Sequence, residues 1–255
     1  MSTLLRERDA RGVHTLTLNQ PSRFNVLDED TLRALSDAVA VVQADPQARV
    51  LVLAAAGKAF CAGHDLKQMA ARPEQAYYED LFARCSRLML ALRALPVPVV
   101  ARVQGLATAA GCQLVAQCDL ALASTEARFG VNGIDVGLFC ATPSVALSRA
   151  MAPRQALEML MTGDFIDADE AQRRGLVNRV SAPDALDAEV ERLVQRLLGK
   201  PREALAMGKV LFYRQLETGL AAAYQMAGHS MACNLAHPVA QEGVQAFIDK
   251  RTPRW

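Results

Sequence analysis

The chain has 255 residues, of which 51% are hydrophobic and 22% charged, a composition typical of a globular protein. Its 28 Lys and Arg residues nearly balance 27 Asp and Glu residues, so the formal net charge is only +1. The basic residues are scattered rather than gathered on one segment, and no apolar run reaches the ~18 residues that span a membrane. We therefore expect neither nucleic acid nor a membrane as a partner.

The cysteines indicate a reducing compartment. They show no CxxC spacing and stand mostly among apolar residues, which is typical of buried free thiols and not of a disulfide framework or a zinc site. Residues 1–11 include acidic residues and lack an apolar core of signal-peptide length. We expect a cytoplasmic protein, or one in a matrix-like compartment, without a metal site. The six positions are Cys61, Cys85, Cys112, Cys118, Cys140 and Cys233.

The first part of the chain alternates strand-like and helix-like segments. Strictly alternating or continuous apolar runs predict strands, and apolar residues at helical spacing predict helices. In chain order we expect a strand at 13–18, a loop at 19–25, a helix from Asp28 to Pro46, a strand at 50–54, a loop at 57–63, a helix over about 73–95, a strand at 96–103, a turn at 105–111, a helix towards Gln117, a strand at 119–123 and a βα-like unit around 176–180. Such repetition is typical of parallel βαβ units and of the α/β class.

The last part of the chain has a different pattern. Residues 184–250 are helical throughout, with breaks near 199–201, at Gly219 and at 237–238. We therefore divide the chain into an α/β core, residues 1–200, and a helical C-terminal region, residues 201–255. This region is apolar enough that it must pack on its own core or on neighbouring subunits.

Two loops of small residues, 59–67 and 105–114, each precede a helix. Small side chains let a substrate approach the backbone, and a helix N-terminus supplies free N–H donors and partial positive charge. Two such helix ends facing each other would form an oxyanion hole for a carbonyl oxygen that becomes anionic. The spacing alone is equally compatible with two tight loop-to-helix junctions.

These loops, together with Asn19-Gln20-Pro21 and residues 247–251, resemble the crotonase (enoyl-CoA hydratase/isomerase) superfamily over nearly the whole chain. Residues 62–66, 105–114 and 136–143 most resemble its enoyl-CoA hydratase domain-containing protein 3 subgroup. The resemblance implies a ClpP-like spiral of ββα units with two roughly perpendicular sheets. It also implies a helical C-terminal region that builds homotrimers, often paired into hexamers, and an acyl-CoA thioester of fatty acid metabolism as substrate, without another cofactor.

The resemblance also implies particular site residues. The oxyanion donors of the family match the backbone N–H groups of His64 and Ala110; the second position is usually Gly, and Ala keeps the N–H. The contacts to coenzyme A match positions in both parts of the chain, with the last two reaching in from the C-terminal region of the same or a neighbouring subunit. They are Arg23, Phe24, Ala62, Asp65, Leu66, Lys67, Phe247 and Lys250.

Both catalytic glutamates of the typical hydratases are replaced. One matches Gln113 and the other matches Gly133. A neutral amide does not take a proton from water near pH 7, and glycine offers no side chain at all. Loss of a general base commonly costs ~10²–10⁴ in rate, so we expect ordinary hydration to be very weak or absent.

Other side chains near the acyl end are candidates for the missing function. For His64 a role of the amide alone is favoured over one of the imidazole, and for Asp135 a cap or ion pair is favoured over acid/base work. Methylmalonyl-CoA decarboxylase, a relative, shares the Ala-Gly-His-Asp loop but carries a tyrosine about where Cys140 stands. We expect residues 68–90 and 129–145 to shape the acyl pocket. The full set of candidates is His64, Cys112, Gln113, Asn132, Asp135, Cys140 and Thr142.

Three functions stay open on the sequence. The first is an enzyme that acts on acyl-CoA through an enolate or oxyanion, by isomerisation, decarboxylation or thioester hydrolysis. The second is a plain enoyl-CoA hydratase, and the third is a non-catalytic acyl-CoA-binding subunit. The residues at positions 113 and 133 distinguish the first from the second. A titrating side chain in the pocket that matters for turnover would distinguish the first from the third.

Overall fold

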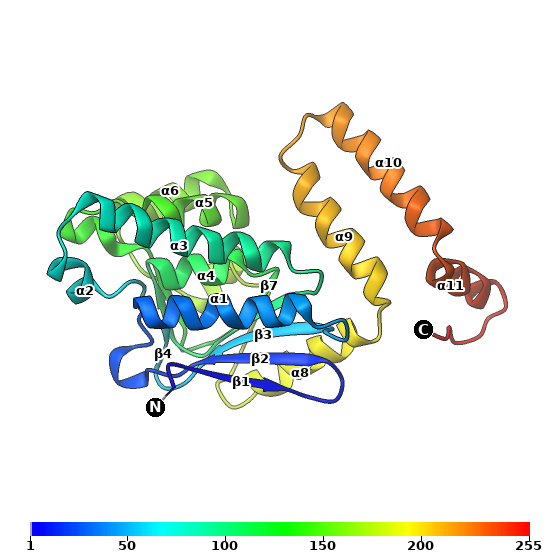
Figure 1. Ribbon diagram of the computed structural model, residues 1–255, viewed down its shortest axis with the longest axis horizontal. Coiled ribbons are helices and arrows are strands. Elements are labelled where there is room, and N and C mark those ends of the chain that lie inside the picture. The colour runs from blue at the N-terminus through cyan, green and yellow to red at the C-terminus, as the bar shows by residue number, and fades with distance from the viewer. Residues whose placement is uncertain (1) are drawn as a thin grey trace.

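In the computed structural model, which describes residues 2–255, the strands form two sheets (Figure 1). The larger sheet has six strands in the order β1 (Leu4–Arg8), β2 (Val13–Leu18), β3 (Val50–Ala55), β5 (Val99–Val103), β7 (Leu120–Ser124) and β10 (Arg179–Ser181). The smaller sheet has four, in the order β4 (Ala59–Cys61), β6 (Leu106–Thr108), β8 (Arg128–Gly130) and β9 (Ile166–Asp167). All neighbouring pairs are parallel except β1 with β2 and β8 with β9.

Successive strands belong to the two sheets in turn. Strands β3, β5 and β7 lie in the larger sheet, whereas β4, β6 and β8, which follow them in the chain, lie in the smaller one. Helices follow the first two of these pairs, so each turn of the chain has the order strand, strand, helix. The predicted α/β class and the spiral of ββα units are therefore confirmed.

The helices surround the sheets and continue into the C-terminal region. They are α1 (Glu29–Ala44), α2 (Leu66–Ala71), α3 (Gln75–Ala94), α4 (Ala110–Gln117), α5 (Ala141–Ala150), α6 (Pro153–Thr162), α7 (Ala168–Arg173), α8 (Leu186–Leu198), α9 (Arg202–Gln215), α10 (Leu220–Ala236) and α11 (Pro238–Ile248), with 3₁₀ turns η1 (Pro21–Arg23) and η2 (Asn132–Val136). Helix α1 begins where predicted because the Asp28 carboxylate accepts the N–H of Thr31 at 2.8 Å.

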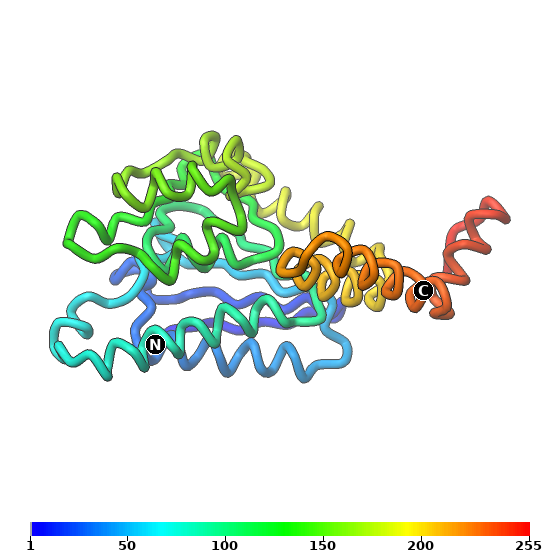
Figure 2. Tube along the Cα trace, turned by 90° about the horizontal axis from the view of Figure 1, so that it is seen from above, coloured from blue at the N-terminus to red at the C-terminus, as the bar shows by residue number. Residues whose placement is uncertain are grey.

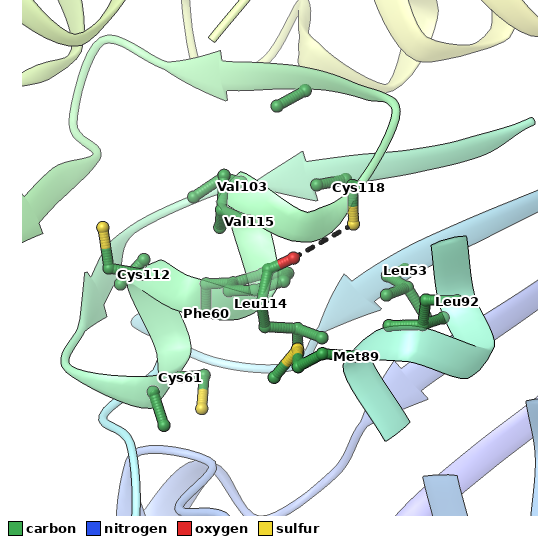
Figure 3. Packing of buried hydrophobic residues seen from close by; sticks show 14 of the residues in the cluster. Leu53, Phe60, Cys61, Met89, Leu92, Val103, Cys112, Leu114, Val115 and Cys118 are labelled. Carbon is green, nitrogen blue, oxygen red and sulfur yellow. Dashed lines mark hydrogen bonds between the residues drawn. The ribbon is translucent and has the colours of Figure 1, made fainter. Parts of the chain in front are cut away.

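The main core lies between the larger sheet and α1, α3 and α4. Helix α4 is its centre: Leu114 packs near Met89, and the thiol of Cys118 donates to the carbonyl oxygen of Leu114 at 3.2 Å (Figure 3). On the opposite face of the sheet a second cluster joins Val50 and Val52 to the apolar side of α8. Strand β3 is therefore buried on both faces, as its continuous apolar run predicts. This packing holds the strand ends of the two sheets at fixed positions.

Helices α9–α11 form an arm that extends away from the α/β body (Figures 1 and 2). Their breaks at 199–201, 219 and 237 fall where the sequence predicts them. The arm is fastened at α9, where Lys209 pairs with Asp119 at 2.7 Å and donates to two carbonyl oxygens, while Tyr213 donates to the same carboxylate at 2.7 Å. The division into residues 1–200 and 201–255 stays a prediction.

Five short strands, β1, β4, β6, β8 and β9, were not expected from the sequence. The expected loops at 57–63 and 105–111 contain the three-residue strands β4 and β6, which pair with each other in the smaller sheet. Strand β1 was not expected, because four of its five residues are exposed and carry no apolar alternation. Such strands form through pairing with a neighbour rather than through their own pattern. Because β4 and β6 are parallel neighbours, both small-residue loops start from the ends of adjacent strands.

Candidate active site

Two strand-to-helix junctions of the smaller sheet lie in direct contact. The first joins β4 to α2 and contains Gly63, and the second joins β6 to α4 and contains Ala109. A Cβ atom on Gly63 would lie 2.9 Å from the Cβ atom of Ala109 and 3.1 Å from the backbone N of Ala110. A Cβ atom on Gly111 would lie 2.0 Å from the carbonyl oxygen of Cys61. The backbones of the junctions approach this closely because glycine stands at both points of contact.

The junctions leave two backbone donors unused. Ala110 is the first residue of α4, and a helix cannot satisfy its own first N–H groups. Within residues 2–255 neither this N–H nor that of His64 has a hydrogen-bond acceptor. Both residues line the same cavity. The structure thus brings the two predicted donor residues to one site.

The backbone at Ala109 is strained. It has φ 49° and ψ −120°, a conformation that residues other than glycine adopt at a cost of about 1–3 kcal/mol. Its N–H donates to the carbonyl oxygen of Gly130 at 3.0 Å, which ties the junction to strand β8. The strain is therefore held by the pairing of the smaller sheet, and it sets the direction of the next peptide, that of Ala110.

The cavity beside these donors has a volume of about 310 Å³ and a largely apolar lining. Its walls come from the first junction, from helix α3 and from the segment after strand β8, in agreement with the predicted segments 68–90 and 129–145. Within residues 2–255, none of the residues that line the cavity bears a carboxylate, an ammonium or a guanidinium group. The lining residues are Ala62, His64, Leu66, Met69, Phe82, Thr108, Ala109, Ala110, Asn132, Gly133, Val136, Leu138, Phe139, Cys140, Ala141, Thr142 and Pro143.

The His64 side chain is held by one of its two ring nitrogens. Its Nδ1 lies 3.3 Å from the carbonyl oxygen of Leu27, and because a carbonyl only accepts, Nδ1 carries the proton. Its Nε2 is buried and has no partner among the described residues. The ring packs edge-on against Phe82, with 5.6 Å between ring centroids. Burial lowers the pKa of His64, and the bond to Leu27 only partly opposes this effect. The imidazole is therefore neutral at pH 7.

The two positions of the missing glutamates differ in their surroundings. Gln113 lies on α4, is only 4% exposed and is not part of the cavity lining; its carboxamide oxygen is buried without a partner among residues 2–255. At Gly133 a Cβ atom would lie 2.4 Å from the carbonyl oxygen of Leu138 and 2.8 Å from Sγ of Cys140. Residues 138–140 thus occupy the space that a side chain at position 133 needs.

A neutral polar pair stands in the cavity instead. The hydroxyl of Thr108 donates to the carboxamide oxygen of Asn132 at 2.7 Å, and both residues line the cavity. Sequence reasoning named Asn132 as a candidate but missed its partner, and it also missed Phe82. The helical spacing of 73–95 places Phe82 on a helix, but only the packing of α3 shows that it faces the cavity.

The thiols near the site are poor nucleophiles. Burial raises the pKa of Cys112 to about 12, and it also raises the pKa of Cys140. Both thiols are therefore protonated at neutral pH, and the nucleophile is the thiolate. All six cysteines are free, as predicted; five are buried, whereas Cys233 on α10 is exposed.

Asp135 lies outside the cavity. It is exposed on η2, and its carboxylate oxygens would lie 2.8 and 3.1 Å from a Cβ atom on Gly163, at the end of α6. The structure therefore does not bring this carboxylate together with His64 and Ala110. Thr142, in contrast, is a lining residue at the start of α5.

Most of the predicted coenzyme A contacts lie around the first junction. Arg23 pairs with Asp65, and the N–H of Ala62 donates to the carbonyl oxygen of Phe24 at 3.0 Å. Asp65 also caps α2 by accepting the N–H of Lys67 at 3.0 Å. Leu66 and Ala62 line the cavity, while Lys67 and Phe24 are exposed. The two remaining predicted contacts, Phe247 and Lys250, lie at the far end of the arm of the same chain (Figure 2).

Residues 8–255 match the family model described as enoyl-CoA hydratase/isomerase. The chain belongs to the enoyl-CoA hydratase/isomerase family. It is 42% identical over 253 residues to the enoyl-CoA hydratase domain-containing protein 3, mitochondrial, of Rattus norvegicus, covering 99% of this chain and 84% of that protein. The predicted family and subgroup resemblance are confirmed.

Solved structures of the family agree with the fold. The crystal structure of an enoyl-CoA hydratase from Mycobacterium smegmatis superposes with a TM-score of 0.99 at 59% identity, covering 100% of this chain and 99% of that one. The human enoyl-CoA hydratase domain-containing protein 3 superposes with a TM-score of 0.95 at 40% identity, covering 99% and 100%. The whole length of this family member, arm included, therefore follows a known arrangement.

Among residues 2–255, no helix is long and apolar enough to cross a membrane, and no three His, Cys, Asp or Glu side chains gather as a metal would require. The sequence predicts a cytoplasmic protein or one in a matrix-like compartment, and several vertebrate relatives of this family member are mitochondrial by name.

Proposed function

We propose that this family member is an enzyme that binds acyl-CoA thioesters and stabilises an enolate of the acyl group. The observation that carries the proposal is the pair of unused N–H groups, those of His64 and Ala110, beside one apolar cavity. Donors fixed by the fold cost no reorganisation when charge develops on the thioester oxygen. An apolar cavity has a low local dielectric constant, which strengthens the interaction between these N–H groups and the developing negative charge. No cofactor is needed beyond the coenzyme A that carries the acyl group.

We propose that coenzyme A lies along the first junction. Arg23 and Lys67 provide positive charge for its phosphates, and Ala62, Asp65 and Leu66 contact its adenine and pantetheine parts, with Phe24 exposed beside them. Arg23 is half exposed even while paired with Asp65, so its guanidinium remains accessible. Phe247, with 85% of its surface exposed, and Lys250 are too distant in their own chain and would serve the site of a neighbouring subunit.

We propose that the arm assembles a homotrimer, or a hexamer of two trimers. Within the described chain α9 has no buried residue, and α10 and α11 have one each. Large apolar side chains are nevertheless exposed along all three helices, which is the mark of an interaction surface. Light scattering should give the mass of three or six copies, and a monomer would contradict the proposal. These side chains are Val210, Phe212, Leu216, Leu220, Tyr224, Met231, Leu235, Val244, Phe247 and Ile248.

The reaction that suits this site best is proton transfer at the carbon next to the thioester, as in isomerisation of a double bond. Hydration is disfavoured because Gln113 and Gly133 replace both water-activating glutamates. Thioester hydrolysis is disfavoured because the lining has no carboxylate to attack the carbonyl or activate water, and the thiol of Cys140 is protonated. Decarboxylation is disfavoured because the lining offers no cation to a second carboxylate, whose burial without a partner is costly. The acyl group is therefore uncharged and apolar.

A screen of acyl-CoA esters by liquid chromatography and mass spectrometry tests the function. The mass identifies each bound ester, and the retention time separates a product of unchanged mass, such as a 2-enoyl isomer, from its substrate. We expect binding of uncharged acyl-CoA and conversion of a 3-enoyl ester. We also expect very weak or no loss of the enoyl absorbance with crotonyl-CoA. Loss at a rate typical of hydratases would establish the plain hydratase instead. Binding of every ester without any product would establish a non-catalytic acyl-CoA-binding subunit, which the absence of carboxylates from the lining favours as the second candidate.

A further inference from the structure

His64, whose amide is one of the two proposed donors, also contributes to the cavity wall. Sequence reasoning favoured an imidazole that only makes local hydrogen bonds. The structure satisfies one ring nitrogen of His64 at the Leu27 carbonyl and leaves Nε2 buried without a partner among residues 2–255. A buried acceptor without a partner costs about 1–3 kcal/mol, so its presence in a cavity wall requires a reason.

The geometry points to His64 as a catalytic residue that carries the proton between two carbons of the acyl group. This inference rests on the proposed function, since it assumes an acyl thioester bound at the two N–H groups. His64 lines the cavity, so in that arrangement its backbone reaches the thioester oxygen and its imidazole is a side chain available to the acyl group. No other lining side chain of the described chain is a base at neutral pH.

The local contacts set the tautomer of the imidazole and keep it neutral. Because Nδ1 carries the proton, Nε2 holds the free lone pair. Phe82 packs against the ring and keeps it in an apolar setting, where burial lowers its pKa and keeps it neutral. Most charged groups of the neighbouring elements are paired: Arg23 with Asp28 and Asp65, Arg72 with Glu29, and Arg84 with Glu29 and Asp80. Asp135 lies beside Gly163, and Lys67 is exposed on α2.

A single base is sufficient for moving a double bond from C3=C4 to C2=C3. Nε2 takes a proton from C2, the electrons of that C–H bond form C1=C2, and the carbonyl electrons move to the thioester oxygen. The oxyanion re-forms the carbonyl, the C1=C2 electrons form C2=C3, and the former C3=C4 pair takes a proton from Nε2 at C4. In deuterium oxide the proton on Nε2 exchanges with solvent before it is returned, so the carbon that receives it is labelled. No other reactant is consumed. Hydration, by contrast, requires a positioned water, for which the typical hydratases use two glutamates.

The test measures the proton transfer and the binding separately. The probe is 3-hexenoyl-CoA in deuterium oxide, with deuterium uptake at C2 and C4 followed by NMR and binding followed by calorimetry. His64→Gln keeps the backbone N–H but cannot accept the proton. We expect it to bind the ester within about threefold of wild type and to lose deuterium uptake by ~10²–10⁴. The matched control His229→Gln, at an exposed histidine on α10, should leave both unchanged.

The pH profile gives a readout that a structural role would not move. Turnover needs neutral His64, whose pKa lies below its ordinary value. Wild-type uptake should therefore be flat near neutral pH and fall as the pH drops through that lowered pKa, and the residual uptake of His64→Gln should lack this fall. Wild-type exchange retained in a folded His64→Gln overturns the inference. Binding without any wild-type exchange also overturns it but leaves acyl-CoA binding intact, whereas absence of binding overturns the proposed function itself.

Discussion

The two walls of the cavity are built from different chemistry. The wall at the β4–α2 and β6–α4 junctions presents backbone N–H groups, and its side chains are mostly small. The opposite wall, residues 132–143, presents side chains, and there the polar groups are a neutral amide, hydroxyl and thiol. Of the two glutamates of the typical hydratases, the one that matches Gly133 would stand on this second wall. The one that matches Gln113 would stand on α4, next to the first wall.

Polarising a carbonyl and moving a proton are therefore separate properties of this fold. The first depends on the course of the backbone, which the sheets and helix N-termini hold. The second depends on a few side chains, which single substitutions remove without altering the course of the chain. At Gly133 the removal is hard to reverse, because residues 138–140 fill the space beside it.

Removing one backbone donor should have the largest effect. Ala110→Pro deletes the N–H at the first position of α4, where proline is well tolerated in a helix. We expect kcat/KM on an accepted acyl-CoA to fall by about 100- to 1,000-fold, as for loss of one oxyanion donor. Ala110→Ser, which keeps the N–H, should remain close to wild type. A folded proline variant with full activity would show that this N–H has no part in the reaction.

Adding a methyl group where the two junctions touch should have the next largest effect. In Gly111→Ala the added methyl would lie 2.0 Å from the carbonyl oxygen of Cys61, so the backbone must move. We expect a loss of about 3 kcal/mol in the free energy of unfolding, measured in urea. Gly228→Ala, on α10 with nothing within 4 Å of the new atom, is the control and should be neutral or stabilising. Equal stability of the two variants would contradict the contact.

The side-chain wall should be more tolerant. In Gly133→Ala the new methyl would lie 2.4 Å from the carbonyl oxygen of Leu138, which belongs to an exposed segment. Because that segment can shift, we expect a loss of about 2 kcal/mol in the free energy of unfolding. We also expect the shift to alter the KM for long acyl groups more than kcat. No change in stability or KM would mean that residues 138–140 do not fill this space in solution.

Relief of strain on the backbone wall should have the smallest effect. Ala109→Gly suits a φ of 49° better than alanine does, so we expect a gain of about 1 kcal/mol in the free energy of unfolding. The peptide of Ala110 stays tied to β8 through the bond from residue 109 to Gly130, so kcat/KM should change by less than threefold. A destabilised variant would mean that packing of the Ala109 methyl outweighs the strain.

Much of this architecture was predictable from local pattern. The apolar run at 50–54, the capping Asp28 and the breaks at 199–201, 219 and 237–238 each act over a few neighbouring residues, and the structure agrees with them. Strands β1, β4 and β6 were missed because they are short or exposed and gain their stability from a partner strand. For the site, the loops suggested an oxyanion hole but were equally compatible with plain junctions.

The fold class, the family and the absence of both hydratase glutamates follow from residue identity and spacing along the chain. What surrounds each site residue depends on the tertiary structure. It placed Asp135 beside Gly163, closed the space at Gly133 with residues 138–140, and left one ring nitrogen of His64 without a partner. Such facts depend on atoms that meet in space from distant parts of the chain. The unused N–H groups of His64 and Ala110 depend on both sequence and tertiary structure. The composition of the loops suggested them, and the contact of two strand ends brought them together.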